Sequence, residues 1–264
     1  MQPEAPRTDG RTASAGRGRR GWRFGLTLAA LFIGTAGLAA AAAGLSAQLL
    51  PRRFTAQQQQ QIAAWETARR WRALPAGRIF PPAITYQLPA YAFGTGAELV
   101  LRADRIGISR QASCGAASDA AAARVLSADR CQAMLRATYA DETDSMLVTV
   151  GVAVMPGDNA AKSAASELST GQGLRPGVRA AGFRSSLAAS FSDHDRQLSW
   201  AVSSGPYLIM STVGYTDGRP RVQVSSDPYA DQELTSFASG VADAVGAPLG
   251  AQPAAPRCPG TPGC

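Results

Sequence analysis

The hydrophobic pattern separates an uncharged N-terminal run from a longer region of mixed character. Residues 24–50 carry no charge, and leucine, isoleucine and phenylalanine recur there among alanines and glycines. A helix needs about 20 apolar residues to cross the hydrocarbon core of a bilayer, and a helix pairs its own backbone polar groups inside lipid. The pattern therefore predicts a transmembrane helix over residues 24–50, through which the chain contacts the lipid bilayer.

The pattern changes twice between this run and the folded region. Thr55 and Gln58 match a capping box and predict a juxtamembrane helix over residues 56–74. No heptad repeat is sustained there, so we interpret it as a solvated stalk, with its tryptophans on the membrane interface or on the domain, and not as a dimerising coiled coil. Four prolines in residues 75–89 then indicate a linker. Residues 51–85 are thus expected to be a juxtamembrane helix and linker.

Residues 86–246 show alternating and helical periods that predict one extracytoplasmic α+β domain. The clearest strand is 146–155, where valine recurs at every second position. Helices are expected at 119–127, at 160–168 after Asp158, and from Pro228 onward, where an apolar stripe comprises Leu234, Phe237, Ala238, Val241 and Val245. The other expected strands are 99–101, 105–109, 131–139, 183–191, 197–203, 207–215 and 221–224.

Hairpin connections between these strands predict a mostly antiparallel sheet, and the apolar stripe predicts that helices pack on one face of it. Residues 247–264 are rich in proline and glycine and contain a pair of cysteines. We expect this tail to be extended.

Charge is concentrated at the N-terminus and indicates orientation. Eight arginines up to Arg53 account for most of the formal charge of +7, and six of them precede the uncharged run. Positive residues stay on the cytoplasmic side, so residues 1–23 are expected to be a basic, disordered cytoplasmic tail. The remainder is nearly neutral and lacks a clustered basic face, which argues against nucleic-acid binding.

Two alternatives to a single retained anchor follow from small residues in the run. Alanines at 39–43 and at Ala47 would suit cleavage of a signal peptide, whose product would be secreted. The length of the run favours a retained anchor. Ala30 and Gly34 are four residues apart and would let two such helices pack closely, but this spacing is common in an alanine-rich helix, so a homo-oligomer is not indicated.

All four cysteines follow the predicted span, in a compartment that permits disulfides. Cys114 and Cys131 bracket a predicted short helix, and Cys258 and Cys264 enclose a turn-rich segment. Local pairing within these two pairs is the simplest of the three connectivities that four cysteines allow. Zinc binding is disfavoured because the single histidine is far from Cys131 in the sequence.

The sequence predicts no catalytic, cofactor-binding or metal-binding residue. A Ser-His-Asp hydrolase requires a histidine, and His194 lies between Asp193 and Asp195 at a predicted hairpin corner, where neighbouring side chains diverge. The acidic group at residues 141–144 also falls on a predicted turn. No nucleophile elbow or phosphate-binding loop occurs. We therefore expect a non-enzymatic binding, sensing or envelope-assembly module, and the alternative is a cell-envelope hydrolase that uses carboxylates such as Asp193 and Asp195.

Several segments resemble an uncharacterised family of actinobacterial single-pass membrane proteins. They are RIGISRQASC, CQAMLRATYAD, VTVGVAVMP, GPYLIMSTVGYTDGRPRV, DPYADQE and the terminal CPGTPGC. The resemblance covers most of residues 50–264. It implies location in the cell envelope and the positions of the cysteines, and it implies no catalytic residue. Separately from the resemblance, the partner expected for a binding module at this location is another envelope protein.

Overall fold

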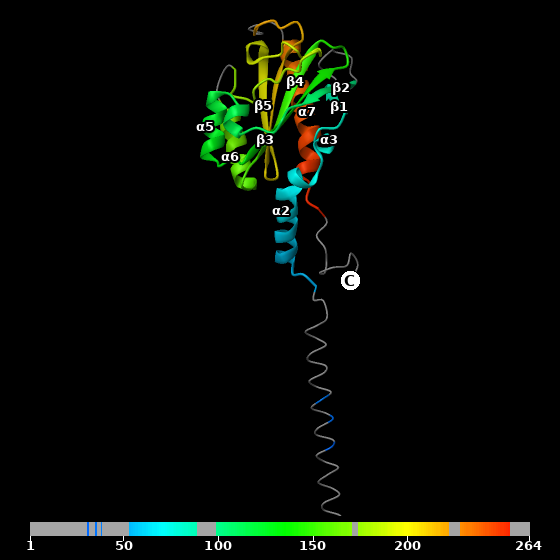
Figure 1. Ribbon diagram of the computed structural model, residues 1–264, viewed down its shortest axis with the longest axis vertical. Helices are drawn as coiled ribbons and strands as arrows, with labels where there is room; N and C mark the ends of the chain where they lie inside the picture. Colours follow the sequence, from blue (N-terminus) through cyan, green and yellow to red (C-terminus); the bar gives the residue numbers. More distant parts are fainter. Residues whose placement is uncertain are drawn as a thin grey trace, which may run out of the picture. The chain divides into compact units, whose positions relative to one another are not determined.

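The computed structural model describes residues 31, 35, 38, 53–88, 99–170, 174–221 and 228–253 (Figure 1). A compact unit, Thr55–Ala255, contains the fold described below. The basic tail, nearly all of the predicted transmembrane segment, Cys258 and Cys264 lie outside the described residues. Among the helices within the described ranges, none is both long and apolar enough to cross a membrane.

The core of the unit is a six-stranded antiparallel sheet in the order β1-β2-β3-β4-β6-β5. This confirms the predicted α+β class. The strands are β1 Ala83–Leu88, β2 Leu99–Ile108, β3 Ala133–Asp141, β4 Met146–Val154, β5 Arg196–Ser204 and β6 Tyr207–Tyr215. The helices are α2 Ala56–Ala73, α3 Ala76–Ile79, α4 Cys114–Ala117, α5 Ala120–Ala128, α6 Asp158–Ser169 and α7 Pro228–Gly250, with one 3₁₀ turn at Asp193–Asp195.

Helix α7 covers one face of the sheet through the predicted apolar stripe. Leu234, Phe237 and Val241 are buried against alternate residues of β4 and β6, including Val150 and Ile209. Side chains on a strand alternate between faces, so the valines of β4 all point toward α7. The largest core of the domain lies between α7 and the sheet, as the apolar stripe of α7 predicted.

The opposite face is also covered, so the prediction of helices on one face only was wrong. Helices α5 and α6 form a second core there with Met134, Ala153 and Met210 of the sheet (Figure 1). Every residue of β4 is buried as a result. Apart from Leu147, its second face carries small residues, and a Cβ at Gly151 would collide with Val178. A strand face made of small residues has the same sequence pattern whether it faces water or a second layer. The sequence therefore did not predict that this face is covered.

Residues 174–192 complete this second layer as an irregular segment, and the strand predicted at 183–191 was wrong. Thr138 donates a hydrogen bond to the Ala181 carbonyl at 2.7 Å, and the Ala181 N–H donates to Thr149 at 2.9 Å. Ser185 adopts a positive φ of 60°, which bends the chain away from strand geometry. The apolar residues of this segment therefore pack on the face of the sheet, and the segment does not add a strand to it.

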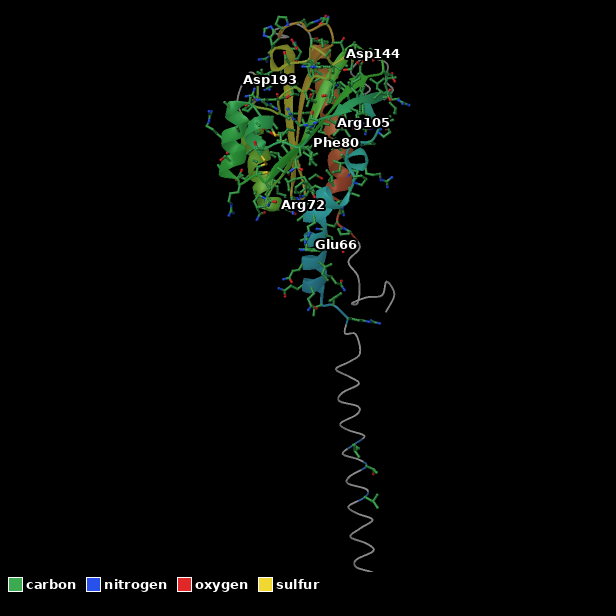
Figure 2. The ribbon with its side chains drawn as sticks, viewed as in Figure 1. Glu66, Arg72, Phe80, Arg105, Asp144 and Asp193 are labelled. Carbon is green, nitrogen blue, oxygen red and sulfur yellow. A yellow bond between two sulfur atoms is a disulfide. The ribbon has the colours of Figure 1, made fainter. Side chains whose placement is uncertain are left out.

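The predicted linker at 75–89 contains helix α3 and strand β1, so that prediction was also wrong. Ile84, Tyr86 and Leu88 alternate with more exposed residues and enter the main core. Arg105 of β2 donates to the Phe80 carbonyl, which fastens this segment to the sheet (Figure 2). The two short strands predicted at 99–109 are one strand, β2, with an irregularity between Arg105 and Gly107.

Other boundaries follow the predictions closely. Helix α2 begins after Thr55 with the expected capping box, and α5 begins after Asp119. Helix α6 begins at Asp158 itself, after Gly157 and without a side-chain cap. Helix α7 continues to Gly250 and takes in the first residues of the predicted tail. Arg221 is not in a strand, and the rest of the strand predicted at 221–224 lies outside the described residues.

Helix α2 is fastened to the end of α7 and to the β5–β6 hairpin. The guanidinium of Arg70 donates to the carbonyls of Pro248, Leu249 and Ala251 at 2.7–2.8 Å, which satisfies the free end of α7. The hydroxyl of Tyr207 donates to the Thr67 carbonyl at 2.6 Å. Trp71 packs against the main core, whereas Trp65 is 59% exposed beside Arg69. The last turns of α2 are thus part of the folded domain.

Candidate functional site

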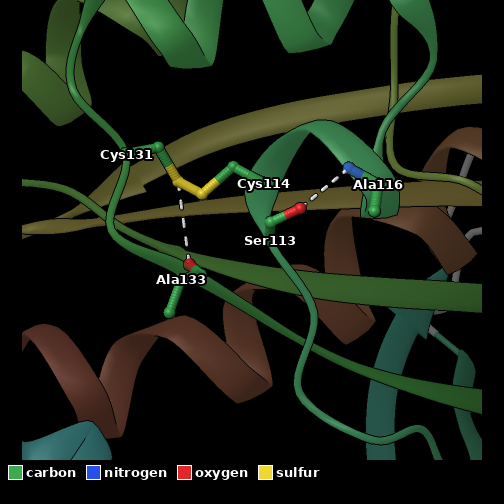
Figure 3. Close-up of a disulfide and its surroundings, with 5 residues drawn as sticks. All are labelled: Ser113, Cys114, Ala116, Cys131 and Ala133. Carbon is green, nitrogen blue, oxygen red and sulfur yellow. Dashed lines mark hydrogen bonds between the residues drawn. A yellow bond between two sulfur atoms is a disulfide. The ribbon is translucent and has the colours of Figure 1, made fainter.

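Cys114 and Cys131 form the predicted disulfide, with their Cα atoms 6.2 Å apart (Figure 3). Ser113 accepts a hydrogen bond from the Ala116 N–H and thereby caps the short helix that begins at Cys114. The bridge closes the chain around α5 just before β3 begins. Cys258 and Cys264 lie outside the described residues. Within the described part of the chain, no group of three His, Cys, Asp or Glu residues could hold a metal ion.

The two carboxylates of the alternative hydrolase hypothesis are engaged in structural bonds. Asp195 is buried, and its carboxylate accepts from the N–H and the hydroxyl of Ser192, both at 2.9 Å. Asp193 accepts from the Ala180 N–H and pairs with Arg179 and Arg196. His194 between them is exposed. Through these bonds, the carboxylates of Asp193 and Asp195 both stabilise the fold around the 3₁₀ turn.

A buried ion-pair network joins this turn to helix α5. Arg196 pairs with Asp119 at 2.7 Å and with Asp193 at 3.1 Å, and only 4% of its side chain is exposed. Asp119 also caps α5 and accepts from the Gly177 N–H. Burial raises the pKa of Asp119, but the hydrogen bonds from Ala122 N–H, Arg196 and Gly177 N–H outweigh burial and hold that pKa below its usual range.

The second acidic group closes the β3–β4 hairpin. Asp141 accepts from the Met146 N–H at 2.6 Å and from the hydroxyls of Thr143 and Ser145. Asp144 adopts a positive φ of 57°, as turns often require. The acidic groups at 141–144 and 193–195 lie well apart in Figure 2. The structure does not bring them together into one site.

Several open grooves flank helix α7 among the described residues, and the residues of two of them are the best candidates for a functional site. The first, the β1–α7 groove, has a volume of about 480 Å³. A Cβ at Gly240 would collide with Tyr86, so this glycine lets α7 approach β1 closely. Burial raises the pKa of Asp243 in this groove. Its lining residues are Thr85, Tyr86, Gln87, Val100, Ser236, Ser239, Gly240, Asp243 and Ala244.

The second groove, which we call the Trp200 groove, lies on the other side of α7 and has a volume of about 340 Å³. Leu198 and Trp200 come from the face of β5 that packs toward α7, and Thr235 comes from α7 itself. Arg175 belongs to the irregular segment of the second layer. The lining residues are Leu174, Arg175, Gln197, Leu198, Ser199, Trp200, Arg221, Asp231 and Thr235.

The sequence held no signal for these grooves. Trp200 alternates with Leu198 and Val202 and is indistinguishable from a core residue of a strand. Arg175 and Arg221 lie far apart in the sequence, and no motif links either of them to Trp200. Their common location depends on how α7 crosses the sheet, and a single sequence does not determine that crossing. The chain matches no protein-family model, no curated protein and no solved structure.

Proposed function

We propose that this chain is a single-pass membrane protein whose extracytoplasmic domain binds a ligand or another envelope protein and has no catalytic activity of its own. The uncharged run at 24–50 and the arginines before it support the anchor and its orientation. The Cys114–Cys131 disulfide supports an oxidising compartment for the domain. The resemblance to an actinobacterial envelope family agrees with this location.

One observation carries the binding role: the open grooves beside α7 are separate from the clustered acidic residues. A hydrolase requires two or more reactive groups that converge on one hollow. Asp193 and Asp195 instead bond to arginines and backbone groups, and neither lines the described grooves. Mixed apolar and polar linings are typical of ligand sites.

Site-specific photocrosslinking in membranes tests the binding role. A photoreactive residue is placed at Gln87 in the β1–α7 groove, at Thr235 in the Trp200 groove, or at the exposed control position Glu167 on α6. We expect a discrete crosslinked species from at least one groove position and none from Glu167. Identical products from all three positions, or no product from either groove, would contradict a binding role for the grooves.

Topology is tested by a reporter that is active only outside the cytoplasm, fused after Cys264. We expect full reporter activity and retention of the chain in the membrane fraction, because arginines precede the uncharged run and the run is long enough to span. An expressed fusion without reporter activity would contradict the orientation. Recovery from the medium with a new N-terminus after Ala43 or Ala47 would show a cleaved signal peptide in place of an anchor.

A further inference from the structure

We propose that the outer edge of strand β1 binds an extended, basic peptide segment of another envelope protein, which adds to the sheet as a further strand along the β1–α7 groove. This inference rests on the binding role proposed above and gives that role a partner chemistry. Three features carry it: the open backbone edge of β1, the short side chains of α7 beside that edge, and two acidic residues on the same side of α7 that have no counter-charge.

The hydrogen-bonding register of β1 shows which of its backbone groups face outward. The strand is at one end of the sheet and pairs only with β2. The Arg105 N–H donates to the Pro82 carbonyl at 2.9 Å, and these two residues are opposite each other where the β1–β2 register continues. Bonded and non-bonded positions alternate along an antiparallel pair, so every second residue from Pro82 onward bonds to β2. The N–H and C=O groups of Ala83, Thr85 and Gln87 therefore point away from the sheet.

This backbone edge is open to a partner. No described residue bonds to the outward groups of Thr85 or Gln87, and both residues are exposed. Edge strands are usually protected by charged residues, proline, a bulge or a covering segment, but β1 contains neither a charged residue nor a proline. At the other end of the sheet, Ser169 of α6 donates to the Ala201 carbonyl of β5 at 3.4 Å. The edge of β1 thus offers the bonding pattern that an added peptide strand requires.

Helix α7 forms the second wall of the groove, beside this edge. Gly240 lies against Tyr86, so the helix runs close along β1 (Figure 1). The α7 residues that line the groove are Ser236, Ser239, Gly240, Asp243 and Ala244. Their side chains are short, and the groove volume of about 480 Å³ is typical of ligand sites. Every second side chain of an added strand can therefore point toward α7.

The charges on this side of α7 favour a basic peptide. Asp243 is the only charged residue in the lining, and Glu233 lies one turn before Ser236 on the same side of the helix. Neither acid forms an ion pair with another residue that the structure describes. Burial, and then the charge of Asp141, raises the pKa of Glu233, so a cation beside it would stabilise the charged carboxylate.

The separation of the two acids matches the repeat of an extended peptide. At 1.5 Å per residue, the helix places Glu233 and Asp243 about 15 Å apart along its axis. Residues four positions apart in a strand lie on the same face, about 13 Å from each other. A peptide with two basic residues at this spacing can therefore pair with both acids while its backbone bonds to β1.

A second copy of this chain fits the groove less well. Strand β1 has the sequence AITYQL and contains no basic residue. Pairing of two β1 strands would satisfy the backbone edges but would leave Glu233 and Asp243 of both copies without a counter-charge. A basic segment of a different protein supplies both the backbone bonds and the charges.

A designed peptide of the sequence TKVTVKT tests the proposal on the full chain in detergent. Its two lysines are four positions apart, and its alternating residues favour an extended conformation. We expect fluorescence anisotropy of the labelled peptide to give a dissociation constant of about 10–100 μM. The control peptide TEVTVET, in which glutamates replace the lysines, should bind at least about 10-fold more weakly, because like charges across an interface repel each other.

Amide hydrogen exchange measured by NMR shows whether the peptide pairs with the edge. In the free chain, we expect the amides of Thr85 and Gln87 to exchange rapidly and those of Ile84 and Tyr86, which bond to β2, to exchange slowly. Saturating peptide should slow exchange at Thr85 and Gln87 by about 10-fold or more and leave Ile84 and Tyr86 unchanged.

Matched variants separate backbone pairing from charge. Thr85→Pro removes one outward N–H but no bond to β2, so it should weaken peptide binding about 10-fold. Thr85→Val keeps that N–H and should bind as the unmodified chain does, and equal melting temperatures of these two variants confirm that the fold is intact. Glu233→Gln and Asp243→Asn are each expected to weaken binding about 3- to 5-fold. Glu167→Gln on α6 should not affect it.

The outcomes can overturn this inference without overturning the binding role. No binding of the lysine peptide, or binding that leaves exchange at Thr85 and Gln87 unchanged, overturns strand addition. Self-association of the chain that protects these two amides without any peptide would identify a second copy as the occupant and would also overturn the inference. In each case, discrete photocrosslinks to another protein from Gln87 or Thr235 in membranes would still support the binding role, so the two proposals can fail separately.

Discussion

Replacing Arg196 by methionine is expected to destabilise the domain by about 3–5 kcal/mol, because breaking a buried ion pair leaves its partners uncompensated. The Arg196 side chain is 4% exposed and pairs with both Asp119 and Asp193. It also donates to the Val178 carbonyl at 3.3 Å, so it links α5, the second-layer segment and the 3₁₀ turn. Denaturant unfolding monitored by tryptophan fluorescence measures the effect.

The control for this prediction is Arg219→Met. Arg219 pairs with Asp217 at 2.5 Å, but about half of each side chain is exposed. Solvent screens such a pair, so this variant should unfold at nearly the same denaturant concentration as the unmodified chain. Equal loss of stability in the Arg196→Met and Arg219→Met variants would contradict the role of the buried network.

The pH dependence of the Arg196→Met effect follows from the lowered pKa of Asp119. A carboxyl whose pKa is lower in the folded state than in the unfolded state stabilises the fold at pH values above its unfolded pKa. That contribution is lost as the pH falls from the unfolded value of about 4 through the lower folded pKa. The difference in stability between the unmodified chain and the variant should therefore shrink on acidification and be largest near neutral pH.

Replacing Cys114 and Cys131 together by serine is expected to cost about 3 kcal/mol, the loop-entropy value for a bridge that spans 17 residues. For a chain of this size that loss lowers the melting temperature by roughly 6–12 °C. The bridge ties the start of α4 to Cys131, two residues before β3, next to the core formed by α5 and α6. Thermal unfolding followed by circular dichroism measures the shift.

Two comparisons sharpen this test. Reducing agent added to the unmodified chain should reproduce most of the shift, and Cys258→Ser with Cys264→Ser should change the melting temperature little, since a bridge between those two closes a short loop near the end of the chain. Peptide mapping under non-reducing conditions then reports the connectivity. A link from either tail cysteine to Cys114 or Cys131 would contradict the pairing of Cys114 with Cys131.

Local signals were sufficient for several elements of this protein. The capping box at Thr55, the valine alternation of β4 and the apolar stripe of α7 each depend on residues within one helix or strand. Their physical causes are local hydrogen bonds and the two side-chain periodicities, so the sequence alone locates them. The Cys114–Cys131 bridge belongs to this group because the two cysteines flank one short helix.

The predictions that were wrong, the linker at 75–89 and the strand at 183–191, share a different cause. Strand β1 has only six residues and follows prolines, so the signals for a linker outweighed its alternating pattern in the sequence. The strand forms because it pairs with β2 and packs against α7. The segment at 183–191 has the composition of a strand, but it bonds to Thr138 and Thr149 on the sheet face. Tertiary contacts override weak local propensity in such segments.

The sequence by itself therefore determined the α+β class, most of the strands and helices, the local disulfide and the uncharged run that motivates the membrane anchor. Only the tertiary structure decided that helices cover both faces of the sheet, that Asp193 and Asp195 are used in structural bonds, and that Trp200, Arg175 and Arg221 line one groove. The physical reason is range: periodicity and capping act within a few residues, whereas layers and grooves depend on the crossing of elements far apart in the chain.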